Sequence, residues 1–456
     1  MSDLAELSTL GGVSRDQISS ALRAVLRAPA PLSLAVQIDG LVSDLDGALQ
    51  AQLDAILHAP AFVALEASWR GLAFAVEGLP LGANVQTAML HARKDELFAD
   101  VDEAPSLLHS ALYRVLYTEQ YGQFGGIPFA AVLLDHAFDA SYADVTLLRA
   151  LAKVGALAHS VVLAAAAPGL LGFQTFEELS DATDLPALRD DVRLRRYQEL
   201  RALDESRYLG LLLPRFLLRE PHGSAPSDRL VFEESAQPLW GNPVYAMGTR
   251  VAAAFVRDGW CVDIAGRSGG RFAPPAAWPD HFLDPAPAHP PIEVVLDEAR
   301  ELDLAELGLV VLSFDSADEQ LVFARTPSSR LPRTFGGREG PRLTLDDRIG
   351  CQLPYVFLAS RIAHGIKVFQ RELLGAGMSA SDLERVLGAR LEALVVDMAT
   401  VPRQLRAQHP LRRAELAVHD HPGHPGWYEI AISIEPHLRY LGAAFSLAVH
   451  GHLERT

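Results

Sequence analysis

The sequence predicts a mixed α/β protein that contains several packed units. Its 456 residues are about three times the usual domain length, which favours two or three such units. Continuous apolar runs at 131–139 (AVLLDHAFD) and 208–218 (YLGLLLPRFLL) are typical of buried strands, and helical periodicity occurs on both sides of them. Near the end of the chain, apolar and polar residues alternate, which predicts an antiparallel meander.

The first 58 residues are predicted to form a helical arm. A short helix is expected over residues 14–27, and the Ala-Pro-Ala-Pro run at 28–31 ends it. A longer amphipathic helix follows and is expected to end near His58. Its apolar stripe comprises Ile38, Leu41, Val42, Leu45, Leu49, Leu53 and Ile56. Its polar face carries Asp39, Ser43, Asp46 and Gln50.

A third helix is predicted to begin at Pro60, because the missing N–H of proline costs nothing in a first helical turn. Large apolar residues then recur at three- and four-residue steps, and we expect that face to pack inward. These residues are Phe62, Leu65, Trp69 and Leu72.

Between the two apolar strands, a helix is expected over residues 150–166, so that strands and helices alternate. The surrounding stretch 154–173 is apolar but Ala-rich, and it includes His159, Ser160 and Pro168. We interpret it as a buried helix with its exit loop, which argues against membrane insertion.

Residues 326–344 are rich in Pro, Gly, Ser and Arg and have no apolar period, which predicts a domain junction. The predicted domains are therefore 1–58, 59–335 and 343–456. Helices over 355–374 and 379–398 are expected to form a hairpin. Three strands are expected to follow within 414–420, 427–437 and 443–453, the last one being strongest over 443–450.

The composition excludes some classes of function. With 57 acidic and 40 basic residues, the net charge is -17, which disfavours a general nucleic-acid binder. The two cysteines, Cys261 and Cys351, are too few for a disulfide framework and lack the spacing of a zinc site. The N-terminus opens acidic and has no secretory signal pattern, so we expect a cytoplasmic protein.

No catalytic motif stands out, and we expect neither cofactor nor metal. His419, His421 and His424 are closely spaced, but two Pro-Gly pairs indicate a tight connection between strands. The glycines at 125–126 and 266–270 match no phosphate-binding fingerprint and read as turns. Cys261 is expected in an apolar, strand-like setting.

Isolated charged residues are interpreted as solvated or paired at the surface. The carboxylates in question are Asp135, Asp139, Glu205 and Glu234. An arginine-rich loop offers a contact for an acidic surface, but solvated charges are the favoured interpretation. Its arginines are Arg325, Arg330, Arg333, Arg338 and Arg342.

Six blocks of the sequence, in order, resemble the large contractile sheath subunit of type VI secretion, the TssC/VipB/EvpB family. The first is the run QIDGLVSDLDGALQAQLDAILHAPAFVALEASWRGL at 37–72. The others lie at 116–135, 204–221, 239–264, 352–372 and 409–454. Three features depart from the family pattern: Gly365 after the histidine, Tyr197-Gln198 in place of a Trp-containing stretch, and a shorter leader before Gln37.

The resemblance implies a contractile-tail-sheath fold and a structural subunit with no substrate. It implies a small sheath subunit of the TssB/VipA type as partner, copies of the chain itself in a helical polymer, an Hcp-like inner tube and a baseplate. A ClpV-like AAA+ ATPase would disassemble the polymer, although the shorter leader puts that contact in doubt. The alternative is a cytoplasmic metal- or phosphate-dependent enzyme.

Two interaction sites are predicted in this framework. The apolar stripe of the N-terminal arm is expected to receive a partner helix through Ile38, Val42, Leu45, Leu49 and Leu53. In the family, terminal extensions join a sheet shared between subunits. Here the expected inter-subunit arm comprises Ile432, Ile434, Phe445, Leu447 and Val449.

Overall fold

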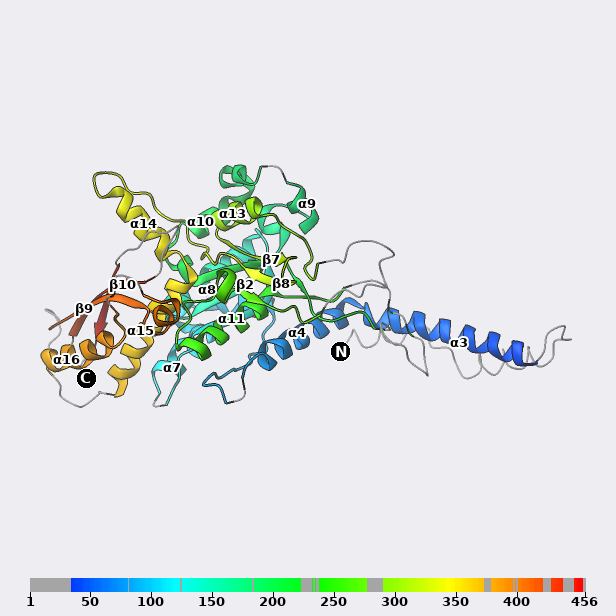
Figure 1. Cartoon of the computed structure of the whole chain (residues 1–456), viewed down its shortest axis with the longest axis horizontal. Coiled ribbons are helices and arrows are strands. Elements are labelled where there is room, and N and C mark those ends of the chain that lie inside the picture. The colour runs from blue at the N-terminus through cyan, green and yellow to red at the C-terminus, as the bar shows by residue number, and fades with distance from the viewer. Residues whose placement is uncertain are drawn as a thin grey trace.

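Figure 1 shows a central body from which one long helix projects, with a small meander at the opposite end of the molecule. In this computed structural model the expected short helix at 14–27 lies outside the described residues. The structure describes residues 34–453 except for 81, 124, 183, 223–231, 233, 235–237, 277–289, 373–378, 397, 399–400, 421–427 and 438–446.

The projecting arm is α3 (Leu34–Leu57), which extends away from the body (Figure 1). It ends beside His58, as its periodicity predicts. α4 (Pro60–Glu77) follows at an angle of 67° and begins with Pro60 in its first turn. Among the described helices, none is by itself long and apolar enough to span a membrane.

The prediction that one apolar face of α4 packs inward is wrong for three of its four residues. Phe62, Leu65 and Trp69 are 37%, 56% and 55% exposed. α4 instead turns its small residues toward α11 (Pro243–Asp258). At Gly71, a Cβ would lie 2.4 Å from Cδ2 of Tyr245, so only glycine permits this approach. Close contact at Gly71 thus fixes the packed face of α4, from which Leu72 and Phe74 also reach the core, and leaves the stripe of Phe62, Leu65 and Trp69 outside.

A six-stranded sheet forms the centre of the body, in the order β1-β2-β3-β7-β8-β6. The first four strands are parallel, and β8 is antiparallel to both β7 and β6. Both apolar runs form strands, as predicted. The strands are β1 (Ala131–Phe138), β2 (Val161–Ala166), β3 (Leu209–Leu213), β7 (Leu309–Asp315), β8 (Gln320–Phe323) and β6 (Arg271–Phe272).

The helix expected over 150–166 is wrong in its second half. α8 (Tyr142–Ala158) ends at His159, whose φ of 50° is left-handed, and residues 161–166 form the fully buried strand β2. Small alanine side chains on a central strand let helices pack closely on both faces. Tertiary packing here outweighs the helix propensity of alanine.

Helices cover both faces of the sheet. One face packs against α5 (Lys94–Glu103), α8, α10 (Arg195–Arg201) and α13 (Glu298–Glu306). The other packs against α4, α11 and α15 (Leu353–Glu372). Shorter elements connect these helices: α6 (Ala111–Tyr113), α7 (Glu119–Tyr121), α9 (Phe176–Asp181), α12 (Gly266–Gly269), β4 (Phe216–Leu217), β5 (Trp240–Gly241), a π turn (Arg114–Thr118), and 3-10 turns Leu107–His109, Pro168–Leu171, Pro186–Asp190, Val192–Leu194 and Asp204–Tyr208.

The C-terminal region builds a third core between helices and the predicted meander. α16 (Ala380–Glu392) begins at its Ser379 cap and ends six residues earlier than the predicted 398. It lies beside α15, because Arg390 stacks 4.3 Å from the ring centre of Phe369. The remaining elements are α14 (Gly340–Gly350), α17 (Arg403–Gln408), β9 (Leu411–Asp420), β10 (Tyr428–Pro436) and β11 (Leu447–Leu453). The three predicted domains remain predictions.

Candidate interaction surfaces

An apolar seam runs along α3 on the projecting arm. Ile38, Val42, Leu45 and Leu49 are 49%, 51%, 42% and 38% exposed, and Leu53 is half-buried. Their three- and four-residue spacing keeps them on one side of the helix. The exposed Phe62, Leu65 and Trp69 repeat the same spacing on α4. The sequence pattern identified this second stripe but placed it in the interior, although the small residues Ala67, Gly71 and Ala75 on another face of the helix indicate which face packs.

Buried ion pairs fix the elbow between α3 and α4. Nε2 of His58 lies 3.3 Å from Oε1 of Glu234, and Arg219 donates to Glu234 at 2.6 Å and to Glu66 of α4 at 2.7 Å. Burial alone would raise the pKa of Glu234, but the hydrogen bonds from Arg219 and the His222 N–H hold it below its usual value. Glu234 is therefore not the surface ion pair expected from sequence.

The meander pairs in the order β11-β10-β9, so β10 is central. Ile432 and Ile434 lie on β10 and are 4% and 1% exposed, packed into the core under α15 and α16. Both edges of their strand are already paired within the subunit, so their place in an inter-subunit arm stays a prediction. The strand that we expected over 443–450 is described over Leu447–Leu453.

The outer edge of β11 pairs with no described strand. Leu447 and Val449 lie opposite Ile434 and Ile432 of β10, and Phe445 lies outside the described residues. The outer edge of β9 is covered at its start, where Val396 donates to the carbonyl of Leu411 at 2.9 Å. Among the described residues, β11 is therefore the more open edge of this sheet.

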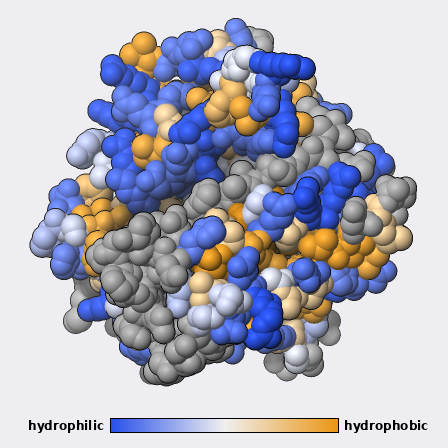
Figure 2. Space-filling view, turned by 90° about the vertical axis from the view of Figure 1, so that its left-hand side faces the viewer, coloured by the Kyte–Doolittle hydropathy of each residue, from blue (hydrophilic) through white to orange (hydrophobic). Residues whose placement is uncertain are grey.

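Figure 2 views the molecule from the end that carries the meander. Its upper part, at the height of α14 in Figure 1, is mainly hydrophilic, whereas apolar residues gather in smaller groups lower on the face. The two candidate surfaces, the α3 seam and the β11 edge, thus lie at opposite ends of the molecule (Figure 1).

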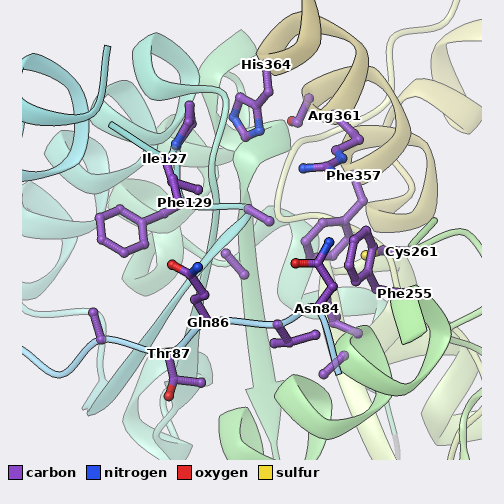
Figure 3. Close-up of a pocket in the computed structure, with 18 of the residues that line it drawn as sticks. Asn84, Gln86, Thr87, Ile127, Phe129, Phe255, Cys261, Phe357, Arg361 and His364 are labelled. Carbon is purple, nitrogen blue, oxygen red and sulfur yellow. The ribbon is translucent and has the colours of Figure 1, made fainter. Parts of the chain in front are cut away.

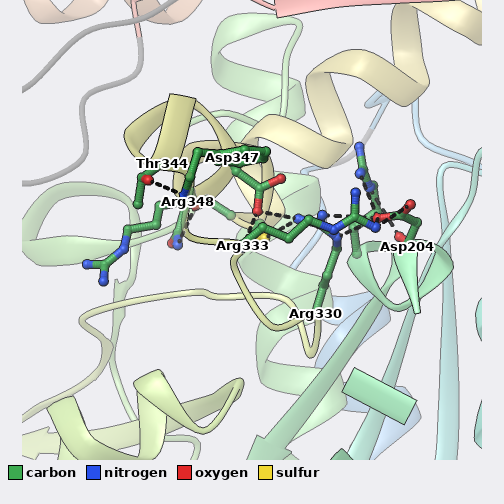
Figure 4. Close-up of polar contacts among 10 residues, drawn as sticks. Asp204, Arg330, Arg333, Thr344, Asp347 and Arg348 are labelled. Carbon is green, nitrogen blue, oxygen red and sulfur yellow. Dashed lines mark hydrogen bonds and ion pairs between the residues drawn. The ribbon is translucent and has the colours of Figure 1, made fainter. Parts of the chain in front are cut away.

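The favoured interpretation of solvated charges is wrong for Arg330 and Arg325 of the arginine-rich loop, whereas Arg338 and Arg342 are exposed, as it expects. Arg330 is 2% exposed and donates to Asp204 at 3.0 Å and to Asp347 of α14 at 2.8 Å. Arg333 donates to both oxygens of Asp204 at 2.9 Å (Figure 4). Arg325 pairs with the buried Glu301. These contacts join the loop to both the sheet domain and α14, whereas Arg338 is exposed.

A cavity of about 800 Å³ lies among residues 84–88, the turn before β1, α11 and α15. Figure 3 shows the amides of Asn84 and Gln86 on one side, with Arg361 and His364 of α15 across from them. Cys261 lies in a bend rather than a strand, and burial raises the pKa of its thiol to about 12. That thiol is a poor nucleophile at neutral pH. Nε2 of His364 contacts the carbonyl of Ala158 at 3.2 Å, a structural role.

The histidines near 420 do not form a described metal site. His419 lies on β9 opposite Glu429, while His421 and His424 lie outside the described residues. In the part of the chain that the structure describes, there is no group of three side chains suited to hold a metal ion. Gly266 and Gly269 lie in α12, Gly270 is its C-cap, and Gly125 occupies a turn with φ of 80°.

Two family models match the chain. The model described as "EvpB/VC_A0108, tail sheath N-terminal domain" matches residues 39–330, and "EvpB/VC_A0108, tail sheath gpW/gp25-like domain" matches residues 343–453. The chain is also 32% identical over 426 residues to the type VI secretion system sheath protein TssC1 of Pseudomonas aeruginosa. That alignment covers 90% of this chain and 84% of the relative.

Similar solved structures have low identity. The sheath tail protein Lin1278 from Listeria innocua is 12% identical with a TM-score of 0.38, over 71% of this chain and 57% of that one. The anti-feeding prophage baseplate is 11% identical with a TM-score of 0.39, over 82% of this chain and 81% of that one. The helical sheath of the anti-feeding prophage in its contracted state is 10% identical with a TM-score of 0.32, over 68% of this chain and 64% of that one. On the two family models and the Pseudomonas relative, the chain belongs to the VipB/EvpB family of type VI secretion tail sheath subunits.

Proposed function

We propose that this chain pairs with a smaller sheath subunit of the TssB/VipA type and polymerises in the cytoplasm around an Hcp-like inner tube. Contraction of the polymer then drives effector injection, and the chain acts as a structural element rather than an enzyme. Family membership supports the sheath role. The same membership is the support for contacts with a baseplate and with a ClpV-like AAA+ ATPase.

The observation that carries the proposal is a pair of surfaces, at opposite ends of the subunit, that no other described element covers (Figure 1). One is an exposed apolar seam on a projecting helix, and the other is an open strand edge. The two surfaces are unlike each other, so contacts made through them are heterologous. Heterologous contacts that do not close into a ring generate helical polymers.

Negative-stain microscopy of the chain co-expressed with its small sheath subunit tests the proposal. We expect tubes from the parent and from Ser43→Asp, which adds charge to the polar face of α3. Leu45→Asp/Leu49→Asp places charge in the seam and should abolish tubes, because burying an unpaired carboxylate costs several kcal/mol. Discrete particles from the parent would contradict the proposal. The alternative is a metal- or phosphate-dependent enzyme; for its metal-dependent form, the described residues contain no group of three side chains that could hold a metal ion.

A further inference from the structure

The apolar seam of α3 is bordered by one kind of charge. The 24 residues of α3 include Asp39, Asp44, Asp46 and Asp54 and contain no Lys or Arg. At about 100° per residue, Asp39 and Asp46 lie within about 90° of the centre of the seam, and Asp44 lies about 130° away on the far side. A helix that covers this seam therefore meets carboxylates along one flank.

A second copy of α3 is a poor occupant, because like charges on neighbouring helices are destabilising. The occupant that fits is a short amphipathic helix with basic residues beside its apolar stripe. The chain itself carries such a pattern directly before α3. Residues 14–27 combine the apolar Ile18, Leu22, Val25 and Leu26 with Arg15, Arg23 and Arg27, against one acidic residue, Asp16.

The connection between the two segments has the right length for a helical hairpin. Residues 28–33 separate residues 14–27 from Leu34, where α3 begins. Helix–helix connections of 2–8 residues commonly join antiparallel neighbours. A helix over 14–27 would be about 21 Å long, shorter than the roughly 36 Å of α3, so the seam can hold all of it.

The charges also match in register. In an antiparallel hairpin with this connection, Arg23 comes level with Asp39, and Arg15 comes level with Asp46. Arg15 and Arg23 lie on the flank of their apolar stripe that faces the Asp39–Asp46 flank of α3 in such a pair. Apolar contact and two ion pairs then act together along one interface.

We propose that residues 14–27 of this chain cover the acidic seam of α3 in the free subunit. Because the two segments are linked, the effective concentration of this occupant is high, in the millimolar range for short linkers. A helix of the small sheath subunit must displace it to reach the seam. This consequence rests on the proposed function, whereas the contact itself does not.

Cleavage by an arginine-specific protease tests the contact on the full chain, with the peptide released by cutting after Arg27 quantified by mass spectrometry. We expect slow cleavage in the parent and about tenfold faster cleavage in Asp39→Lys/Asp46→Lys, because both ion pairs become repulsive. The lysines add no site for this protease. The matched control, Asp44→Lys on the far side of α3, should stay within about twofold of the parent.

The decisive variant combines Asp39→Lys/Asp46→Lys with Arg15→Glu/Arg23→Glu, which restores opposite charges and should restore slow cleavage after Arg27. Unchanged cleavage in the first double variant, or no restoration in the combined one, overturns the proposal. If protection from cleavage after Arg27 rises with protein concentration, another copy of the chain occupies the seam. If that protection requires the small subunit, the small subunit occupies it. Either outcome also overturns the proposal. Tube formation is scored separately, so tubes without this protection pattern refute the contact and leave the proposed function standing.

Discussion

Single charged residues hold distant parts of this chain together. Arg330 is buried between Asp204, which follows α10, and Asp347 on α14 (Figure 4). Burial alone would lower the pKa of its guanidinium, but hydrogen bonding to Asp347 outweighs burial, and the pKa is raised. Arg330 therefore remains charged in the fold, where it pairs with Asp347 and shares Asp204 with Arg333.

Arg330→Ala should lower the free energy of unfolding by about 3 kcal/mol, because it removes a buried guanidinium together with its ion pairs to Asp347 and Asp204. Arg338→Ala, in the same loop but exposed, should change it by less than about 0.5 kcal/mol. Urea denaturation of the two variants beside the parent measures the difference. Equal midpoints for the two variants would show that the ion pairs contribute nothing net.

Two buried histidines predict how stability depends on pH. Burial lowers the pKa of His364 to about 4 and that of His159 to about 3, from an ordinary value of 6.5. Nearby positive charge on Lys367 adds to the effect at both. Between pH 6.5 and 4 the unfolded chain binds protons that the folded chain does not, so the free energy of unfolding falls as the pH falls.

The variant His364→Gln can still donate to the Ala158 carbonyl. It should reduce the fall in the free energy of unfolding between pH 6.5 and 4 by up to about 3 kcal/mol. Chemical denaturation at a series of pH values measures it. An unchanged slope in His364→Gln would remove this histidine as the cause.

Sequence could not reveal these roles, because the partners are far apart along the chain. Arg330 and Asp204 are separated by 126 positions, and an arginine in a Pro- and Gly-rich loop has the same local pattern whether it is solvated or buried. The same holds for Glu234 and its contact with Glu66 through Arg219. When only the sequence is known, the partners of a charged residue cannot be seen, and the pattern then favours the interpretation that its charge is solvated.

At the scale of whole elements, close helix packing determines how α4 sits. A Cβ at Gly71 would overlap the ring of Tyr245, whereas a Cβ at Gly47 of α3 meets nothing within 4 Å. Gly71→Ala should therefore cost about 1–3 kcal/mol through overpacking, even though alanine favours helix. Gly47→Ala should stabilise by up to about 1 kcal/mol. Thermal unfolding of both variants checks the opposite signs, and a gain at both positions would contradict the packing of α4 on α11.

Helices with a clear apolar stripe could be predicted closely, but Ala-rich segments could not. α3 ends where its stripe ends, and Ser379 caps α16 as its sequence predicts. The run at 150–166 was misassigned because alanine suits a helix and also a strand between two packed helices. Only the left-handed turn at His159, invisible to periodicity, separates α8 from β2.

Over the whole molecule, ordered sequence blocks were enough to predict a sheath subunit, and the family models confirm it. The assignment of individual interface residues stays a prediction. Ile432 and Ile434 alternate like edge-strand residues, yet β10 is the central strand of its sheet and both are buried. Alternation shows that a strand has one buried face, but it does not distinguish a centre from an edge.

The open edge of β11 leads to the last prediction, which concerns polymer growth. Successive N–H groups of a strand point to opposite edges, so one of Leu447 and Ala448 donates toward β10 and the other faces outward. Proline removes the donor and fixes φ. The variant that loses the outward donor should still co-purify with the small sheath subunit, through α3, but form no long tubes.

The proline variant at the other of these two positions is the matched control. It removes a hydrogen bond to β10, so it should weaken the meander and lower the melting temperature more than the variant that loses the outward donor. The two variants therefore separate an assembly defect from a folding defect. Co-purification, thermal unfolding and negative-stain microscopy of Leu447→Pro and Ala448→Pro, each with the small subunit, give the three readouts. Long tubes from both variants would show that no neighbouring strand extends this edge, and polymer growth would then have to use another surface of the subunit.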